Sequence, residues 1–187
     1  SRVDPVATGI TTTAQTVTLS SSGTTSASFT QNQALCSNLT IKAQTISVLT
    51  YISIISGTMP ANPAITAQIK YGSNNIISFS NPVYNASTGM LTWTGVLGSD
   101  VTVPSGQSIT LQVTTAQTGV SFKISFNSMT KPSRISLLPV STFVDITSFS
   151  IYDAAYPAGN VISSSNSNTN VYARAVVTNP FGYRDIT

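Results

Sequence analysis

Apolar and polar side chains alternate residue by residue along several short stretches of this chain. The clearest stretch is 120–127, whose apolar members are Val120, Phe122, Ile124 and Phe126, with Ser121, Lys123 and Ser125 between them. Successive residues of a β-strand point to opposite faces of the sheet, so this pattern places one face in a core and the other in water. The same alternation occurs in 64–71, 90–95 and 108–114. A helix has a period of about 3.6 residues and cannot produce it. The chain is therefore predicted to be all-β.

Gly, Pro, Asn and Ser interrupt the apolar stretches at short intervals, which is typical of antiparallel sheets joined by tight turns. The strands predicted on this basis are Gln15–Ser20, Asn38–Lys42, Ile46–Ile55, Ala64–Tyr71, Ile76–Ser80, Met90–Gly95, Ser108–Thr114, Val120–Asn127 and Arg134–Leu138. Many short strands at such spacing favour an Ig-like antiparallel β-sandwich. The residues expected in its core are Ile41, Ile54, Ile69, Trp93, Leu111, Phe122, Ile124 and Phe126.

A domain boundary is predicted near residues 138–142, where Pro, Ser and Thr interrupt the pattern. We expect an N-terminal arm or first strand in 1–18, a β-sandwich domain in 19–140 and a partial second Ig-like unit in 141–187. The strands predicted for that unit are Phe143–Tyr152, Val161–Ser164 and Val171–Thr178. Three or four strands bury too little apolar surface to be stable alone. The second unit is therefore expected to be truncated or completed by another chain.

The ionisable residues exclude most catalytic mechanisms. The chain has no His and no Glu, and its five acids are Asp4, Asp100, Asp145, Asp153 and Asp185. A glycosidase needs two carboxyl groups that face one another across the substrate. Asp145 and Asp153 are nearest in sequence, but eight residues of extended strand would separate them by about 26 Å. The sequence predicts a protein without enzymatic activity and without catalytic residues.

The sequence also gives no clear indication of a cofactor or metal site. Calcium is the most credible ion because surface β-modules bind it with Asp and backbone carbonyls, yet no loop carries the spaced acids of a calcium site. Lysines could form isopeptide cross-links, but Lys42, Lys70 and Lys123 have the parity of solvent-facing residues. Cys36 is the single cysteine and lies between Leu35 and Leu39, so we expect it to be a small buried hydrophobe. No cofactor-binding or metal-binding residue is predicted.

The charges also limit the partners. A net charge of +3 comes from eight dispersed cations, which is not the basic patch that nucleic acids require. The most apolar stretch, Ile46–Ile55, is shorter than the roughly 20 residues of a membrane-spanning helix, so no membrane insertion is expected. Low charge with many Ser, Thr and Asn residues is typical of secreted or surface-displayed proteins. No signal peptide is visible at Ser1, and we expect a removed leader or a fragment of a longer protein.

Two segments near the C-terminus carry a family resemblance. The residues of 145–160, which include the run Tyr-Asp-Ala-Ala-Tyr-Pro-Ala-Gly, and those of 171–182, which end in Asn-Pro-Phe-Gly, resemble the start of Ig-like repeat modules. Such modules occur in very large surface and secreted proteins of Bacteroidota-type bacteria. The resemblance implies an extracellular, adhesin-like repeat and supplies no catalytic residue.

The leading hypothesis is therefore a non-catalytic, extracellular structural or adhesive module of a bacterial cell-surface protein or filament. Its expected partners are neighbouring domains or copies of the same protein, joined by strand addition. The strand donor would be the arm Ser1–Thr18, with its apolar residues Val3, Val6, Ile10 and Val17. The alternative is a carbohydrate-binding accessory module of a secreted enzyme. That module would bind surface polysaccharide on an aromatic platform formed by Trp93, Tyr51, Tyr71 and Tyr84.

Overall fold

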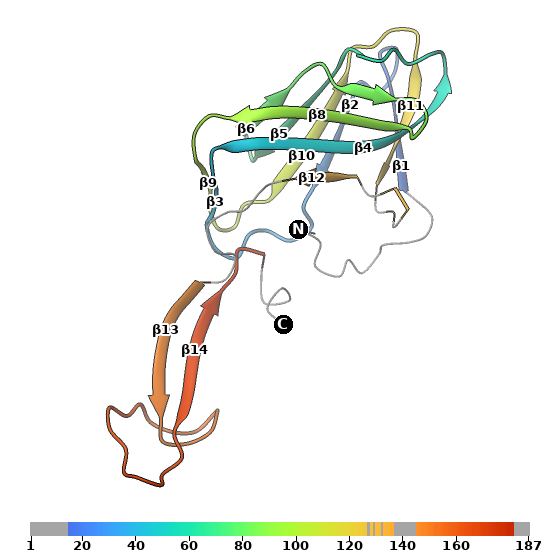
Figure 1. Cartoon of the computed structure of the whole chain (residues 1–187). Helices are drawn as coiled ribbons and strands as arrows, with labels where there is room; N and C mark the ends of the chain where they lie inside the picture. The colour runs from blue at the N-terminus through green and yellow to red at the C-terminus, as the bar shows by residue number, and fades with distance from the viewer. Residues whose placement is uncertain (1–14, 127, 129, 132, 137–144, 182–187) are drawn as a thin grey trace.

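The computed structural model describes residues 15–126, 128, 130–131, 133–136 and 145–181. Over these residues the fold is all-β and contains no helix, which confirms the predicted all-β class (Figure 1). Its strands are β1 (Gln15–Ser20), β2 (Ser26–Thr30), β3 (Leu39–Ile41), β4 (Gln44–Ser56), β5 (Ile65–Tyr71), β6 (Asn74–Phe79), β7 (Val83–Asn85), β8 (Met90–Leu97), β9 (Val101–Val103), β10 (Ile109–Thr115), β11 (Ser121–Phe126), β12 (Arg134–Ser136), β13 (Asp145–Tyr152) and β14 (Tyr172–Thr178).

Two antiparallel sheets pack face to face as a sandwich. One sheet has the order β1-β11-β4-β8-β7, and the other has the order β2-β10-β5-β6. The long strand β4 pairs with β11 along its second half and with β12 along its first half. Strands β3 and β9 form a separate pair, as do β13 and β14. Buried residues from both large sheets belong to one hydrophobic cluster, which is the core of the sandwich.

The alternation of the sequence locates most of this core correctly. Six of the residues predicted for it are buried: Ile41, Ile69, Trp93, Leu111, Phe122 and Ile124. Ile54 is half-buried and packs against this core, whereas Phe126, also half-buried, is not part of it. Phe126 is the last residue of β11 and pairs with Gln15 at the start of β1, so it lies at the rim of the sandwich. Its ring meets that of Phe29 edge-on, with the centroids 5.2 Å apart.

One face of β11 is less wet than its sequence indicates. Ser125 has the parity of a solvent-facing residue but is only 3 % exposed. The chain after β11 folds back, so that the Ser133 hydroxyl donates to the carbonyl of Ser125 at 2.6 Å and accepts from the amide of Tyr51 at 3.3 Å. The hydroxyl of Ser133 thus links β11 to β4. The next residue, Arg134, begins β12, which pairs with β4.

Strand boundaries differ from prediction mainly where strands are short or poor in apolar residues. β2, β7 and β9 were not expected, because two of them have three residues and the third has the weakly apolar sequence Ser-Ala-Ser-Phe-Thr. Conversely, the predicted strand Val161–Ser164 is reduced to one bridge between Val161 and Tyr152. The segment from 145 onward therefore contributes two strands among the described residues, where three or four were expected.

The predicted N-terminal arm is partly absorbed into the sandwich. Gln15–Ser20 pairs along its whole length with β11 of the same chain, and Val17 packs against the core. Val17 is thus not available to a neighbouring molecule, which corrects the predicted donor segment. Val3, Val6 and Ile10 lie outside the described residues.

An ion pair joins the ends of β3 and β9. Lys42 Nζ lies 2.7 Å from Asp100 Oδ2, and Asp100 Oδ1 accepts a hydrogen bond from the Ala43 amide at 2.9 Å. The hydrogen bond from Lys42, followed by that from the Ala43 backbone, holds the pKa of Asp100 below its ordinary value of 3.8. Both side chains are about half exposed. The ion pair therefore lies at a surface turn and does not contribute to the core.

We predict that Lys42→Met will raise the pKa of Asp100 toward its ordinary value, as measured by NMR titration of the carboxyl carbon. A carboxyl group whose folded pKa is depressed stabilises the fold above its unfolded pKa, and that contribution is lost as the pH falls through the folded pKa. Any stability difference between wild type and Lys42→Met should thus be present at neutral pH and disappear below the folded pKa of Asp100. An unchanged titration curve in the variant would contradict the role given to Lys42.

Candidate functional site

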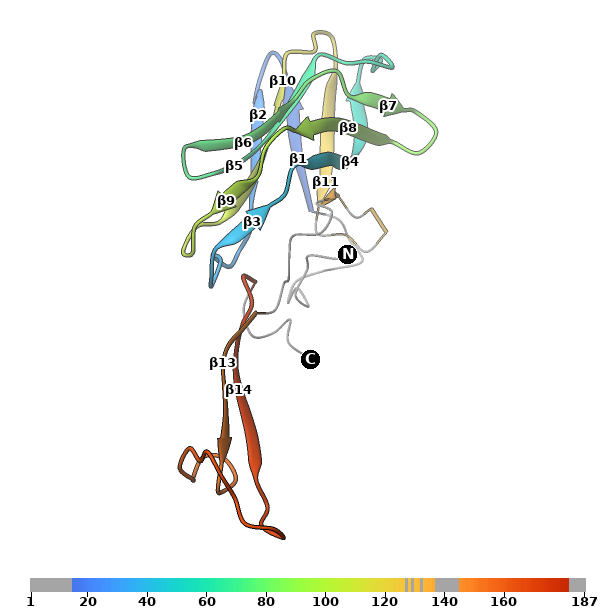
Figure 2. The ribbon, with the colours of Figure 1, turned by 60° about the vertical axis from the view of Figure 1, so that its left-hand side comes forward.

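The hairpin formed by β13 and β14 stands apart from the rest of the molecule. Both views show it extending away from the sandwich as a two-stranded antiparallel sheet (Figures 1 and 2). Ten large apolar side chains are exposed in the described residues, and seven of them belong to this hairpin and its tip. They are Ile146, Phe149, Tyr156, Val161, Val171, Tyr172 and Val176. The hairpin and its tip therefore carry most of the exposed large apolar side chains of the described structure.

One face of the hairpin is apolar throughout. Residues directly opposite one another on antiparallel strands share a face of the sheet. Three such pairs form what we call the apolar face: Ile151–Ala173, Phe149–Ala175 and Ile146–Val177. Phe149 is 62 % exposed and Ile146 is 61 % exposed. No charged or hydroxyl-bearing side chain belongs to these pairs, so water meets a continuous hydrocarbon surface.

A β-bulge makes this face continuous. The register shifts between Ile146 and Ser148, which leaves Thr147 as an extra residue on β13. Ile146 and Phe149 are three residues apart, so in a regular strand without the bulge they would lie on opposite faces. The Thr147 hydroxyl donates to the carbonyl of Val176 at 3.1 Å across the bulge. A local irregularity thus adds a third apolar pair to the face.

The opposite face of the hairpin carries hydroxyl groups and a charge, together with the exposed side chain of Val176. Its cross-strand pairs are Ser148–Val176, Ser150–Arg174 and Tyr152–Tyr172. The guanidinium of Arg174 lies 3.8 Å from the ring centroid of Tyr152 and 5.5 Å from that of Tyr156. Hydroxyl groups and a cation suit this face to water. The hairpin is therefore amphipathic, as half of a β-sandwich would be.

Arg174 also organises the loop at the hairpin tip. Its Nη2 donates to the carbonyls of Ala154, at 2.8 Å, and Ala158. Within the same loop, Asp153 Oδ1 accepts a hydrogen bond from the Asn160 amide at 2.7 Å. The two segments that carry the family resemblance are thus brought together, because the arginine of one binds the backbone of the other.

Arg174→Gln should loosen this loop without affecting the sandwich. It removes the ring contacts and the two hydrogen bonds, each worth about 0.5–1.5 kcal/mol. We expect amide exchange at Asp153 and Asn160 to become at least about tenfold faster, since 1.4 kcal/mol corresponds to about a factor of ten. Arg174→Lys keeps the charge but not the planar fork, so it should behave similarly. Unchanged exchange in both variants would contradict this role.

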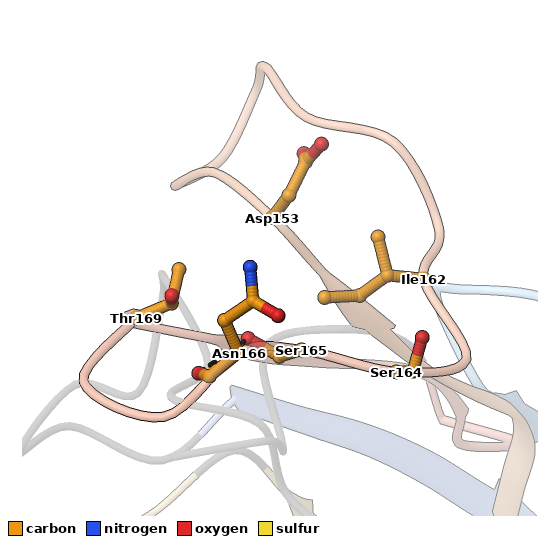
Figure 3. Close-up of a pocket in the computed structure, with 6 residues that line it drawn as sticks. All are labelled: Asp153, Ile162, Ser164, Ser165, Asn166 and Thr169. Atoms are coloured by element: carbon orange, nitrogen blue, oxygen red, sulfur yellow. Dashed lines mark hydrogen bonds between the residues drawn. The ribbon is translucent and has the colours of Figure 1, made fainter.

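The acids Asp145 and Asp153 lie far apart along the chain of β13. Asp145 begins β13 and Asp153 follows its last residue, so they occupy opposite ends of the strand. Beside Asp153 the tip has a shallow hollow of about 380 Å³ (Figure 3). Its lining consists of Asp153, Ile162, Ser164, Ser165, Asn166 and Thr169. Nowhere in the described ranges do three or more His, Cys, Asp or Glu side chains gather as metal ligands would.

The root of the hairpin is fixed to the sandwich by residues that the sequence reading missed. The Pro180 carbonyl accepts a hydrogen bond from the Cys36 amide at 2.7 Å, and Phe181 is buried within the core cluster. Asn179 is also buried, and its Oδ1 accepts from the Phe181 amide at 2.8 Å. The prediction that Cys36 is buried is wrong, because its thiol is exposed while Leu35 turns inward.

The aromatic platform of the carbohydrate-binding alternative is not formed. Trp93 is fully buried in the core, where its Nε1 donates to the Ile65 carbonyl at 3.2 Å. Tyr51, Tyr71 and Tyr84 are half-buried. A ring that stacks on a sugar must present its face to solvent, which Trp93 cannot do.

Comparison of the chain with protein-family models and with curated proteins gives no match. Among the described residues, none lies in a helix long and apolar enough to cross a membrane.

Proposed function

We propose that this chain is a non-catalytic, extracellular structural or adhesive module of a large bacterial surface protein or filament, which joins its neighbours through the β13–β14 hairpin. The apolar face carries this proposal. A lone two-stranded sheet is marginally stable in water, and exposed apolar patches on projecting elements mark sites of interaction. The face is therefore suited to docking rather than to solvent.

The hairpin edges support strand addition as one mode of joining. In the described ranges β13 and β14 pair with each other alone, apart from the bridge between Tyr152 and Val161 at the tip. Each strand thus keeps an outer edge whose backbone groups can accept another strand. Neighbouring domains or other copies of the protein are the partners that this chemistry fits.

The surroundings of the acids support a non-catalytic role. Asp100 is held in an ion pair with Lys42, and Asp153 accepts a hydrogen bond from the backbone of its own loop. The resemblance of 145–182 to surface repeat modules supports the extracellular location. The burial of Trp93 weighs against the carbohydrate-binding alternative, because the proposed aromatic platform depended on that residue.

Cysteine labelling on intact cells that produce the protein tests location and docking together. Cys36 is exposed and should react with a membrane-impermeant maleimide without lysis. Labelling that requires lysis would refute the extracellular location. In a Cys36→Ser background, Ala175→Cys places a thiol on the apolar face without removing any of its large side chains, and Ser148→Cys places a thiol on the opposite face.

Both thiols should react quickly in the purified chain. On intact cells we expect the thiol at position 175 to react at least about tenfold more slowly than that at position 148, because a docked partner excludes the reagent. Equal rates on cells would show that nothing covers the apolar face, and the proposed function would be wrong. Hydrolysis of esters or polysaccharides by the purified chain would overturn its non-catalytic part.

A further inference from the structure

We infer that the apolar face is covered by the same face of a second copy of this chain, packed hairpin on hairpin. This inference rests on the proposed function and adds the identity of the occupant and its orientation. It starts from the shape of the face. The large side chains Ile146, Phe149 and Ile151 lie on β13, and two of the three residues opposite them on β14 are alanines, Ala173 and Ala175.

This division of large and small side chains makes the face complementary to itself. Two stacked sheets lie about 10 Å apart and interdigitate their side chains. A two-fold axis midway between them and parallel to the strands places β13 of each copy over β14 of the other. Phe149 of each copy then packs against Ala175 of the other, and Ile151 packs against Ala173. A two-fold axis across the strands would instead oppose β13 to β13, crowding large side chains together and leaving gaps between alanines.

The charges of the hairpin permit identical copies to meet. The apolar face carries no charged residue, and Arg174 pairs with Ser150 on the opposite face. Its guanidinium is engaged there with Tyr152 and with loop carbonyls. Two copies therefore bury no like charges against each other, and the face offers no charge that would select an oppositely charged partner. The hairpin also projects beyond the sandwich, which leaves this face accessible (Figures 1 and 2).

The size of the face sets the strength of the pairing. A seven-residue strand is about 24 Å long, and two strands are about 10 Å wide. Such a face is smaller than the roughly 800 Å² per partner of a standard stable interface. We therefore expect a dissociation constant on the order of 100 µM for free chains. Pairing becomes substantial where copies are held close together, as on a surface or in a filament.

Sedimentation equilibrium of the purified chain from about 10 µM to 1 mM tests the inference, with a size swap at one pair. Phe149→Ala removes the large side chain, and Ala175→Phe fills the site that receives it, so each should weaken dimerisation at least tenfold. The double variant Phe149→Ala/Ala175→Phe exchanges large for small at paired positions and should restore wild-type dimerisation to within about threefold. Val176→Ala removes an exposed apolar side chain from the opposite face and should leave dimerisation unchanged.

Thermal unfolding of each variant checks that the sandwich remains folded. A wild type that stays monomeric at 1 mM overturns the inference. If the thiol at position 175 is nevertheless protected on cells, the proposed function stands and another polypeptide covers the face. A double variant no better than the single variants overturns the two-fold arrangement.

Discussion

Trp93→Ala should lower the free energy of unfolding by about 3–5 kcal/mol, the usual cost of removing a large aromatic side chain from a packed core. Trp93 is fully buried in β8, and its indole donates to the Ile65 carbonyl of β5 on the facing sheet. The alanine variant loses the packing of the ring and the one side-chain hydrogen bond that this ring makes between the sheets. Urea denaturation followed by circular dichroism measures the loss.

Trp93→Phe separates the two contributions. It retains most of the apolar volume but leaves the Ile65 carbonyl without the indole donor, so we expect a loss of about 1–3 kcal/mol. A loss below about 1 kcal/mol for Trp93→Ala would contradict the central place of this residue in the core.

Gly57→Ala should be comparably damaging, for a reason that lies in the backbone. Gly57 has a φ of +79°, and a Cβ atom there would lie 1.9 Å from the carbonyl oxygen of Gly119. The backbone of one turn must move to admit it, and we expect a loss of about 3 kcal/mol or more in total. The left-handed conformation itself accounts for about 1–2 kcal/mol of that loss.

Gly106→Ala is the matched control for Gly57→Ala. Gly106 has nearly the same φ, +80°, but no atom lies within 4 Å of the position of its Cβ. Its alanine variant should lose about 1–2 kcal/mol from the conformation alone. The difference between the two variants in urea denaturation then measures the clash with Gly119. Equal losses of unfolding free energy in the two variants would show that the backbone at Gly119 moves aside without a measurable loss of stability.

Period-two alternation was enough to predict the sheets but not their irregularities. It locates Phe122 and Ile124 correctly because β11 runs through the middle of a sheet, between β1 and β4. It fails at Ser125, whose burial depends on a hydroxyl eight residues further along the chain. It also misses β2, in which Phe29 and Ala27 are the only apolar residues. Its pairing with β10 supplies the stabilisation that local sequence does not.

The candidate site could be predicted in outline. Both strands of the hairpin follow from the apolar pattern after residue 143. The continuous apolar face does not, because the bulge at Thr147 depends on register against β14. The contacts of Arg174 with Tyr152 and Ala154 join residues about twenty positions apart, which no local pattern reveals. The docking of Phe181 is a tertiary contact of the same kind.

The attachment of the hairpin root has a mechanical consequence for a module that bears load. β1 begins at the same end of the sandwich from which the hairpin projects (Figures 1 and 2). Tension between these two points would therefore peel β1 from β11, starting at the pair Gln15–Phe126 and breaking the hydrogen bonds one after another. Strands loaded in this way separate at lower force than strands sheared along their length. β1 would therefore be the first strand released under load, and its release would withdraw the buried side chain of Leu19 from the core of the sandwich.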